Sequence, residues 1–138
     1  MSALLLFVTA ALAQSTLVCE AASGPALRYE TWSKSGGAYP GPGTVMETEG
    51  WSLGDVVLYS RARFYMDPEK VTGKLDWAWD PDATRQRSVK SEGMSRTIVY
   101  TAKVDVWTRD GSPIHPELPE PRATVRMRCE SLEVWGIP

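Results

Sequence analysis

The chain has 138 residues, with 15 Lys or Arg against 17 Asp or Glu, which gives a formal net charge of −2 at pH 7. A nearly balanced charge provides no bulk attraction to nucleic acid or to an anionic membrane surface, so neither is expected as a partner. The length suits one domain that is large enough to bury a hydrophobic core.

An apolar stretch begins the chain. Residues 1–13 read MSALLLFVTAALA, and the Ala11-Leu12-Ala13 triplet before Gln14 has the small-x-small form of a signal-peptidase site. The alternative is a buried N-terminal strand or helix. Stable membrane insertion is not expected, because a span needs about 20 apolar residues and polar residues soon interrupt this run. We therefore predict a signal peptide at 1–13, one β domain at 14–138, and a periplasmic or extracellular location.

Two cysteines, Cys19 and Cys129, lie near opposite ends of the chain. In an oxidising compartment they most simply form one disulfide, which would join the first strand to the last; two free thiols are the alternative. Two Cys and the distant His115 cannot supply a closed ligand set, so we expect no metal site and no other cofactor. The chain contains no asparagine and so no N-glycosylation acceptor, which fits a bacterial exported protein.

Alternation of apolar and polar residues predicts β-strands through most of the chain. The expected strands cover residues 16–21, 26–33, 44–51, 55–65, 71–79, 97–107 and the segment from 122 onward. A turn at 67–70 should join the fourth and fifth of these as an antiparallel hairpin. Charged residues at 80–94 predict a long loop, and four prolines predict an irregular loop at 109–121.

The last strand changes its apolar phase. Met127 and Cys129 are apolar at odd positions, whereas Leu132 and Val134 are apolar at even positions. A slip of one residue suggests a β-bulge near 130–131. Taken together, the pattern predicts an all-β fold: an antiparallel β-sandwich or small β-barrel of about seven strands with one disulfide between its terminal strands.

Four arginines are candidate ligand-binding residues. Arg61 and Arg63 lie on one strong strand, and Arg126 and Arg128 lie on another. If those strands are neighbours, four guanidinium groups share a sheet face that could hold an anionic glycan, a lipid phosphate or an acidic protein. The alternative is ordinary cross-strand pairing with acidic residues.

Tryptophan is frequent, with six residues in the chain. Trp77 and Trp79 are in phase with Leu75 and are expected in the core. Trp107 and Trp32 each fall on the strand face opposite to the apolar residues of that strand. They are the best candidates for an exposed aromatic binding site. A second packed layer or an oligomer interface would explain them as well.

Catalytic signatures are weak. His115 is the only histidine, and no serine stands in a G-x-S-x-G context. Asp76 and Asp80 share a strand face but would lie about 13 Å apart, too far for the acid and base of a glycosidase. We therefore expect no enzyme but an exported binding module for a glycan, a lipid or another anionic ligand. The alternatives are a protein-interaction or inhibitor domain acting through loop 109–121, and a small glycoside hydrolase using Asp76, Asp80 or Glu130.

Overall fold

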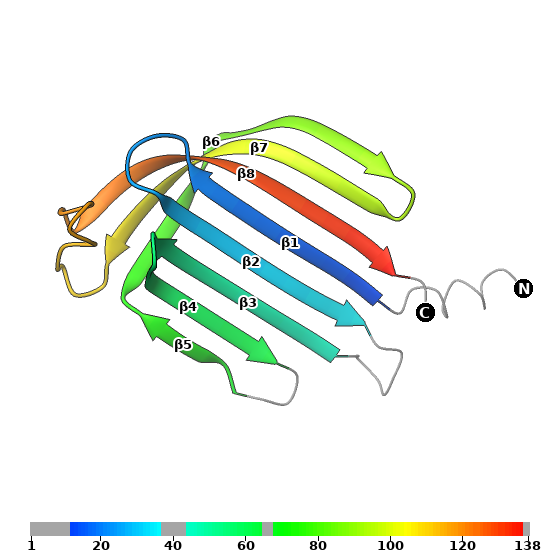
Figure 1. The fold of residues 1–138 in the computed structure, drawn as a ribbon, viewed down its shortest axis with the longest axis horizontal. Coiled ribbons are helices and arrows are strands. Elements are labelled where there is room, and N and C mark those ends of the chain that lie inside the picture. The colour runs from blue at the N-terminus through cyan, green and yellow to red at the C-terminus, as the bar shows by residue number, and fades with distance from the viewer. Residues whose placement is uncertain (1–11, 37–43, 65–67, 137–138) are drawn as a thin grey trace, which may run out of the picture.

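The computed structural model describes residues 12–36, 44–64 and 68–136, and these form an all-β protein (Figure 1). The strands are β1 (Leu12–Ala21), β2 (Leu27–Gly36), β3 (Thr44–Leu53), β4 (Val56–Phe64), β5 (Lys70–Gly73), β6 (Leu75–Glu92), β7 (Ser95–Thr108) and β8 (Arg122–Gly136). The predicted signal peptide at 1–13 lies outside the described residues except for Leu12 and Ala13, which begin β1.

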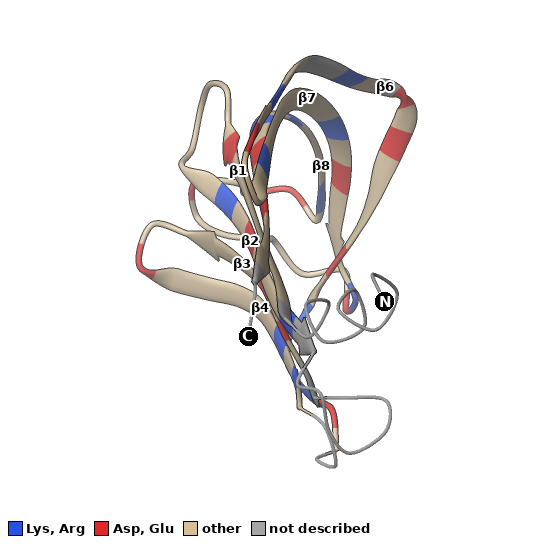
Figure 2. Cartoon of the chain, turned by 90° about the vertical axis from the view of Figure 1, so that its right-hand side faces the viewer, with Lys and Arg blue, Asp and Glu red and all other residues tan. Residues whose placement is uncertain are grey.

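The eight strands form a single antiparallel sheet in the order β5-β4-β3-β2-β1-β8-β7-β6. Figure 2 shows that β6 and β7 curve away from the plane of β1 to β4, so the sheet curls into a half-barrel. The prediction of an antiparallel all-β fold is confirmed. The sandwich alternative is wrong, because the described strands belong to one sheet and bury their apolar residues by curling it.

The predicted disulfide is confirmed. Cys19 on β1 and Cys129 on β8 are direct cross-strand partners, with a Cα–Cα distance of 4.0 Å. Both side chains are fully buried. The bond therefore joins the two strands at the centre of the sheet, where the first and last segments of the described chain lie side by side.

The predicted bulge in the last strand is wrong. The register of β8 with β1 runs unbroken from Met127 to Gly136. Leu132 and Val134 are exposed on the outer face, at 39% and 37%. An irregularity lies instead in β4, where the register with β3 shifts and both Leu58 and Tyr59 are buried. Because Leu58 and Tyr59 are adjacent and both buried, the residues after Tyr59 alternate between the two sheet faces in the opposite phase to those before Leu58.

The predicted long loop at 80–94 is also wrong, since β6 continues to Glu92 as a partner of β7. Its register shifts between Asp80 and Arg85 and again between Gln86 and Ser88. Bulges and charged side chains are typical of edge strands, and β6 forms one edge of this sheet. The bulged residues therefore interrupt the alternation of apolar and polar residues without ending the strand.

The predicted hairpin between 55–65 and 71–79 forms only in part. Residues 70–73 pair with β4 as β5, and the chain then leaves that edge and pairs with β7 as β6. The transition occurs at Gly73, whose φ is 98°. The N–H of Lys74 donates to the Leu58 carbonyl at 3.2 Å, and the N–H of Arg109 donates to the Lys74 carbonyl at 2.8 Å. The two sheet edges are thus joined at one end of the half-barrel.

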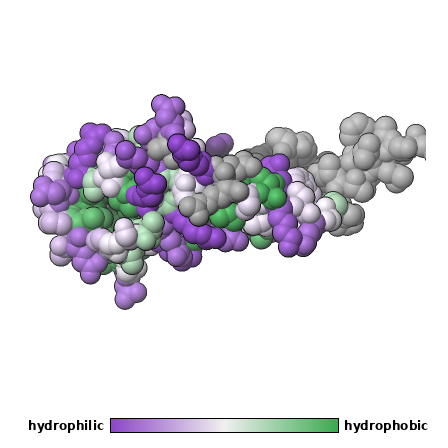
Figure 3. Space-filling view, turned by 90° about the horizontal axis from the view of Figure 1, so that it is seen from above, coloured by the Kyte–Doolittle hydropathy of each residue, from purple (hydrophilic) through white to green (hydrophobic). Residues whose placement is uncertain are grey.

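The core lies on the concave side and is rich in aromatic rings. Trp77 and Trp79 of β6 reach across the curl to Tyr29 of β2 and Trp51 of β3, with ring centroids 5.5 to 6.5 Å apart. The prediction that Trp77 and Trp79 pack in the core is confirmed. From above, apolar residues appear as patches bounded by polar ones (Figure 3).

The loop between β7 and β8 covers one end of this core. Ile114 is only 3% exposed and belongs to the core cluster, and Leu118 packs against that cluster. His115 and Leu118 exchange two backbone hydrogen bonds, of 3.0 and 2.8 Å. The irregular loop predicted at 109–121 is therefore present, and its middle serves as a cap.

Candidate functional site

The four predicted arginines do not form one surface. Strand β4 carries Arg61 and Arg63, and three strands separate it from β8, which carries Arg126 and Arg128. The irregularity in β4 places Arg61 opposite Glu49 of β3. The Arg61 Nε lies 3.2 Å from the Glu69 Oε1 and 3.9 Å from the Glu49 Oε1. Acidic partners therefore already surround Arg61.

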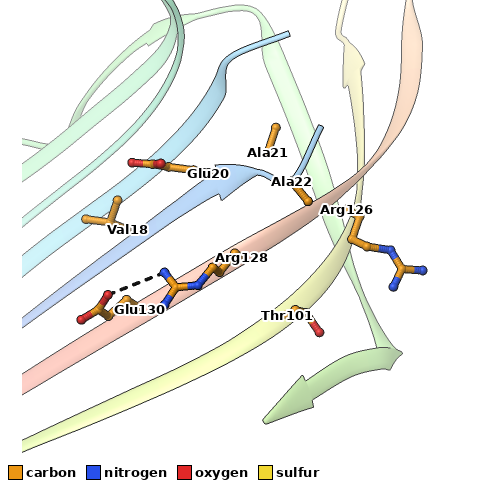
Figure 4. A pocket seen from close by; sticks show the side chains of 8 residues that line it. All are labelled: Val18, Glu20, Ala21, Ala22, Thr101, Arg126, Arg128 and Glu130. Atoms are coloured by element: carbon orange, nitrogen blue, oxygen red, sulfur yellow. Dashed lines mark ion pairs between the residues drawn. The ribbon is translucent and has the colours of Figure 1, made fainter. Parts of the chain in front are cut away.

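The other two arginines line a cavity of about 490 Å³ on the outer face, between β1, β7 and β8 (Figure 4). The Arg128 Nη1 lies 3.8 Å from the Glu130 Oε2, and Glu20 lines the same cavity. The Arg126 side chain extends away from Arg128 in Figure 4. Positions of Lys or Arg and of Asp or Glu are both scattered along the strands in Figure 2. The cavity therefore has mixed charge, and its arginines do not converge.

The two candidate tryptophans lie far apart. Trp32 shares a cross-strand row with Thr16, Leu132 and Thr97. Trp107 is ten positions beyond Thr97 on β7, a separation of about 33 Å along a strand. They cannot contribute to one small-molecule site.

Trp107 has a local partner of its own. The Arg122 guanidinium lies 5.2 Å from the Trp107 ring centroid, and its Nη2 lies 3.0 Å from the Asp105 Oδ2. Hydrogen bonds from Thr124 and then Arg122 lower the pKa of Asp105. The opposite charges of Arg122 and Asp105 therefore balance each other within this cluster on the outer face.

The candidate catalytic side chains are engaged locally. The Asp76 Oδ1 accepts a hydrogen bond from Arg109 at 2.9 Å, and the Asp80 Oδ1 accepts one from the backbone N–H of Asp82 at 3.0 Å. The His115 Nδ1 accepts one from the N–H of Glu117 at 3.0 Å. Within residues 12–36, 44–64 and 68–136, no three His, Cys, Asp or Glu side chains gather as a possible metal site.

A different cavity lies on the concave side, and we call it the concave groove. Its volume is about 530 Å³, and it is lined by residues of β6 and β7: Trp79, Pro81, Thr84, Ile98 and Tyr100. Trp79 and Tyr100 are half-buried and pack against the core. Tyr100 is also the cross-strand partner of Cys129, which is fully buried. The groove therefore continues the apolar core to the surface.

A polar network adjoins the groove through Trp79. The Trp79 ring centroid lies 5.5 Å from that of Tyr29, whose hydroxyl donates a hydrogen bond to Glu49. Burial, followed by the hydrogen bond to Glu49, raises the pKa of Tyr29. Burial also raises the pKa of Tyr100. Both phenols stay protonated at neutral pH and remain hydrogen-bond donors.

Sequence reasoning missed the groove as a site. The signal was present, because Ile98 and Tyr100 continue the apolar phase of their strand and Trp79 is apolar in its own. Alternation identifies the apolar face of a strand, but it does not reveal where a second layer stops covering that face.

No family model, no curated protein and no solved structure matches this chain. Among the described residues, no helix has the length and apolar character needed to cross a bilayer.

Proposed function

We propose that the protein is an exported, non-enzymatic binding module that holds a small ligand with an apolar body in the concave groove. The observation that carries this proposal is the cavity of about 530 Å³ formed where core side chains of β6 and β7 reach the surface. Concave, mainly apolar cavities of this size are typical small-molecule sites. The disulfide between Cys19 and Cys129 is consistent with export.

The lining favours a lipid-like ligand over a glycan. Among the side chains that line the groove, Thr84 and Tyr100 offer hydroxyl groups, Trp79 offers one indole N–H, and Pro81 and Ile98 are apolar. A sugar carries hydroxyls around its ring, and each one buried without a partner costs about 1–3 kcal/mol. An alkyl chain or an apolar ring system has no such cost and gains free energy from burial.

Calorimetric titration of the mature protein with 1-decanol and with cellobiose tests the ligand class. We expect heat from decanol and none from cellobiose. Ile98→Gln should weaken decanol binding by about tenfold, because it puts an amide into the apolar lining. Val57→Gln, at a site 64% exposed on another strand, is the matched control and should bind as the parent does. Absence of decanol binding to folded protein would overturn the proposal.

A further inference from the structure

We infer that the ligand of the concave groove is an amphiphilic anion, with an apolar body against Trp79, Ile98 and Tyr100 and a carboxylate or phosphate end bound by Arg96. The inference rests on the proposed function, because it places the charged end of a ligand whose apolar end occupies the groove.

Arg96 lies on the same face of β7 as the groove. Arg96, Ile98 and Tyr100 alternate along the strand, so their side chains share one side of the sheet. Their partners on β8 are Glu133, Ser131 and Cys129. The buried Cys129 marks the covered end of this row, and Arg96 lies about 7 Å beyond Ile98 toward the other end. Tyr100 and Ile98 therefore form an apolar strip that runs from the core to the Arg96 side chain.

The hydrogen bonding of Arg96 is incomplete. Its Nη2 lies 3.0 Å from the Glu133 Oε2, which is the ion pair that the structure gives it. Its Nε is buried and has no hydrogen-bond partner among the described residues. A guanidinium has five N–H donors, and a buried donor left without an acceptor has lost the hydrogen bond that water gives it in the unfolded chain. Because the Nε is enclosed by protein atoms, an incoming anion would bind the exposed part of the guanidinium, where Nη2 is shared with Glu133.

An anionic oxygen group suits these donors. The Arg96 side chain is 42% exposed, so a ligand approaching through the groove can reach the guanidinium. Arginine binds carboxylate and phosphate through two parallel hydrogen bonds, which an alcohol cannot accept in the same way. Glu133 competes for the same cation, so the ligand anion has to share it or displace the carboxylate.

Calorimetric titrations of the mature protein with decanoate, decyl phosphate and 1-decanol, each below its solubility and micelle limits, test the inference. We expect the preferred anion to bind at least tenfold more tightly than decanol. Comparison of decanoate with decyl phosphate identifies which of the two headgroups is preferred. Arg96→Gln should lower the affinity for both anions to about that for decanol, and Arg96→Lys should retain part of the preference for the anions.

Glu133→Gln should change the affinity for the anions in the direction opposite to Arg96→Gln. Removal of the competing carboxylate should tighten decanoate binding several-fold without changing decanol binding. Lys90→Gln is the matched control, since this exposed cation is paired with Glu92 on the same hairpin and should have no effect. Thermal unfolding of each variant verifies that it is folded.

The outcomes separate the two proposals. Equal affinity for decanol and both anions, or equal weakening of all three by Arg96→Gln, would overturn the role of Arg96 while leaving the binding module in place. Failure of all three ligands to bind folded protein would overturn the binding module as well.

Discussion

Gly73 connects β5 to β6 with a φ of 98°, and a Cβ at this position would lie 2.3 Å from the carbonyl oxygen of Leu58. Gly73→Ala should therefore lower the free energy of unfolding by about 2–5 kcal/mol, through backbone strain and displacement of β4. Urea denaturation measures the loss. Gly111→Ala is the control, because its φ is also positive but no atom lies within 4 Å of its Cβ position. Equal losses in both variants would contradict the steric argument.

Tyr29 gives a prediction for alkaline pH. Burial and the hydrogen bond to Glu49 raise its pKa above the ordinary value of 10.0. Above that pH the unfolded chain loses the phenolic proton while the folded protein keeps it, so stability falls as pH rises. Tyr29→Phe should reduce the loss of unfolding free energy by about 1.4 kcal/mol for each pH unit. Part of the slope should remain, because the pKa of Tyr59 and Tyr100 is raised as well.

Urea denaturation between about pH 9 and pH 11.5 checks this slope, because the range begins about one unit below the ordinary tyrosine pKa. At neutral pH the same variant should lose about 1–2 kcal/mol of stability, because Glu49 loses its phenolic donor. Identical slopes for the parent and Tyr29→Phe would show that this phenol titrates equally in both states.

The loop between β7 and β8 caps the core through Ile114. Ile114→Ala should lower stability by about 2–5 kcal/mol, because it leaves a cavity under the loop. Glu117→Ala changes an exposed residue three positions on and should leave the melting temperature almost unchanged. Equal melting temperatures for the two variants would argue that the loop is dispensable. The capping role bears on the interaction-loop alternative, since removal of residues 112–119 would also remove Ile114 from the core.

Alternation alone predicts β2, β3 and β7 close to their observed bounds, whereas β1 begins at Leu12 and not at residue 16. It failed where the backbone departs from a period of two. The adjacent buried residues Leu58 and Tyr59 mark the irregularity in β4, and the charged stretch at 80–92 conceals two shifts in β6. Sequence patterns of this kind do not distinguish a bulged edge strand from a loop.

The candidate site was less predictable than the fold. A face shared by Arg61 and Arg126 required β4 and β8 to be neighbours, and strand order depends on contacts distant in sequence. Ile98 and Tyr100 follow the apolar alternation of their strand, yet their exposure depends on how far the sheet curls. The disulfide was the exception, because two cysteines allow only one pairing within the chain.

The bond between Cys19 and Cys129 closes a loop with a sequence separation of 110 residues. The double substitution Cys19→Ala and Cys129→Ala should lower the free energy of unfolding by up to about 4–5 kcal/mol, the value that the chain-entropy model gives for so long a loop. Urea denaturation with and without a reducing agent measures it. Reduction should destabilise the parent and leave the double variant unchanged, and a parent insensitive to complete reduction would contradict the argument.

The strand order places β8 between β1 and β7, and the contact of β8 with β1 is the one strand pairing in the sheet that joins segments distant in the chain. During synthesis, β1 can pair with β2 at once, but its other edge has no partner until β8 emerges. A chain that stops short of β8 therefore exposes the hydrogen-bonding edge of β1 to other chains, which is a route to aggregation. Shortening this protein from its C-terminal side is thus expected to produce insoluble material rather than a smaller domain.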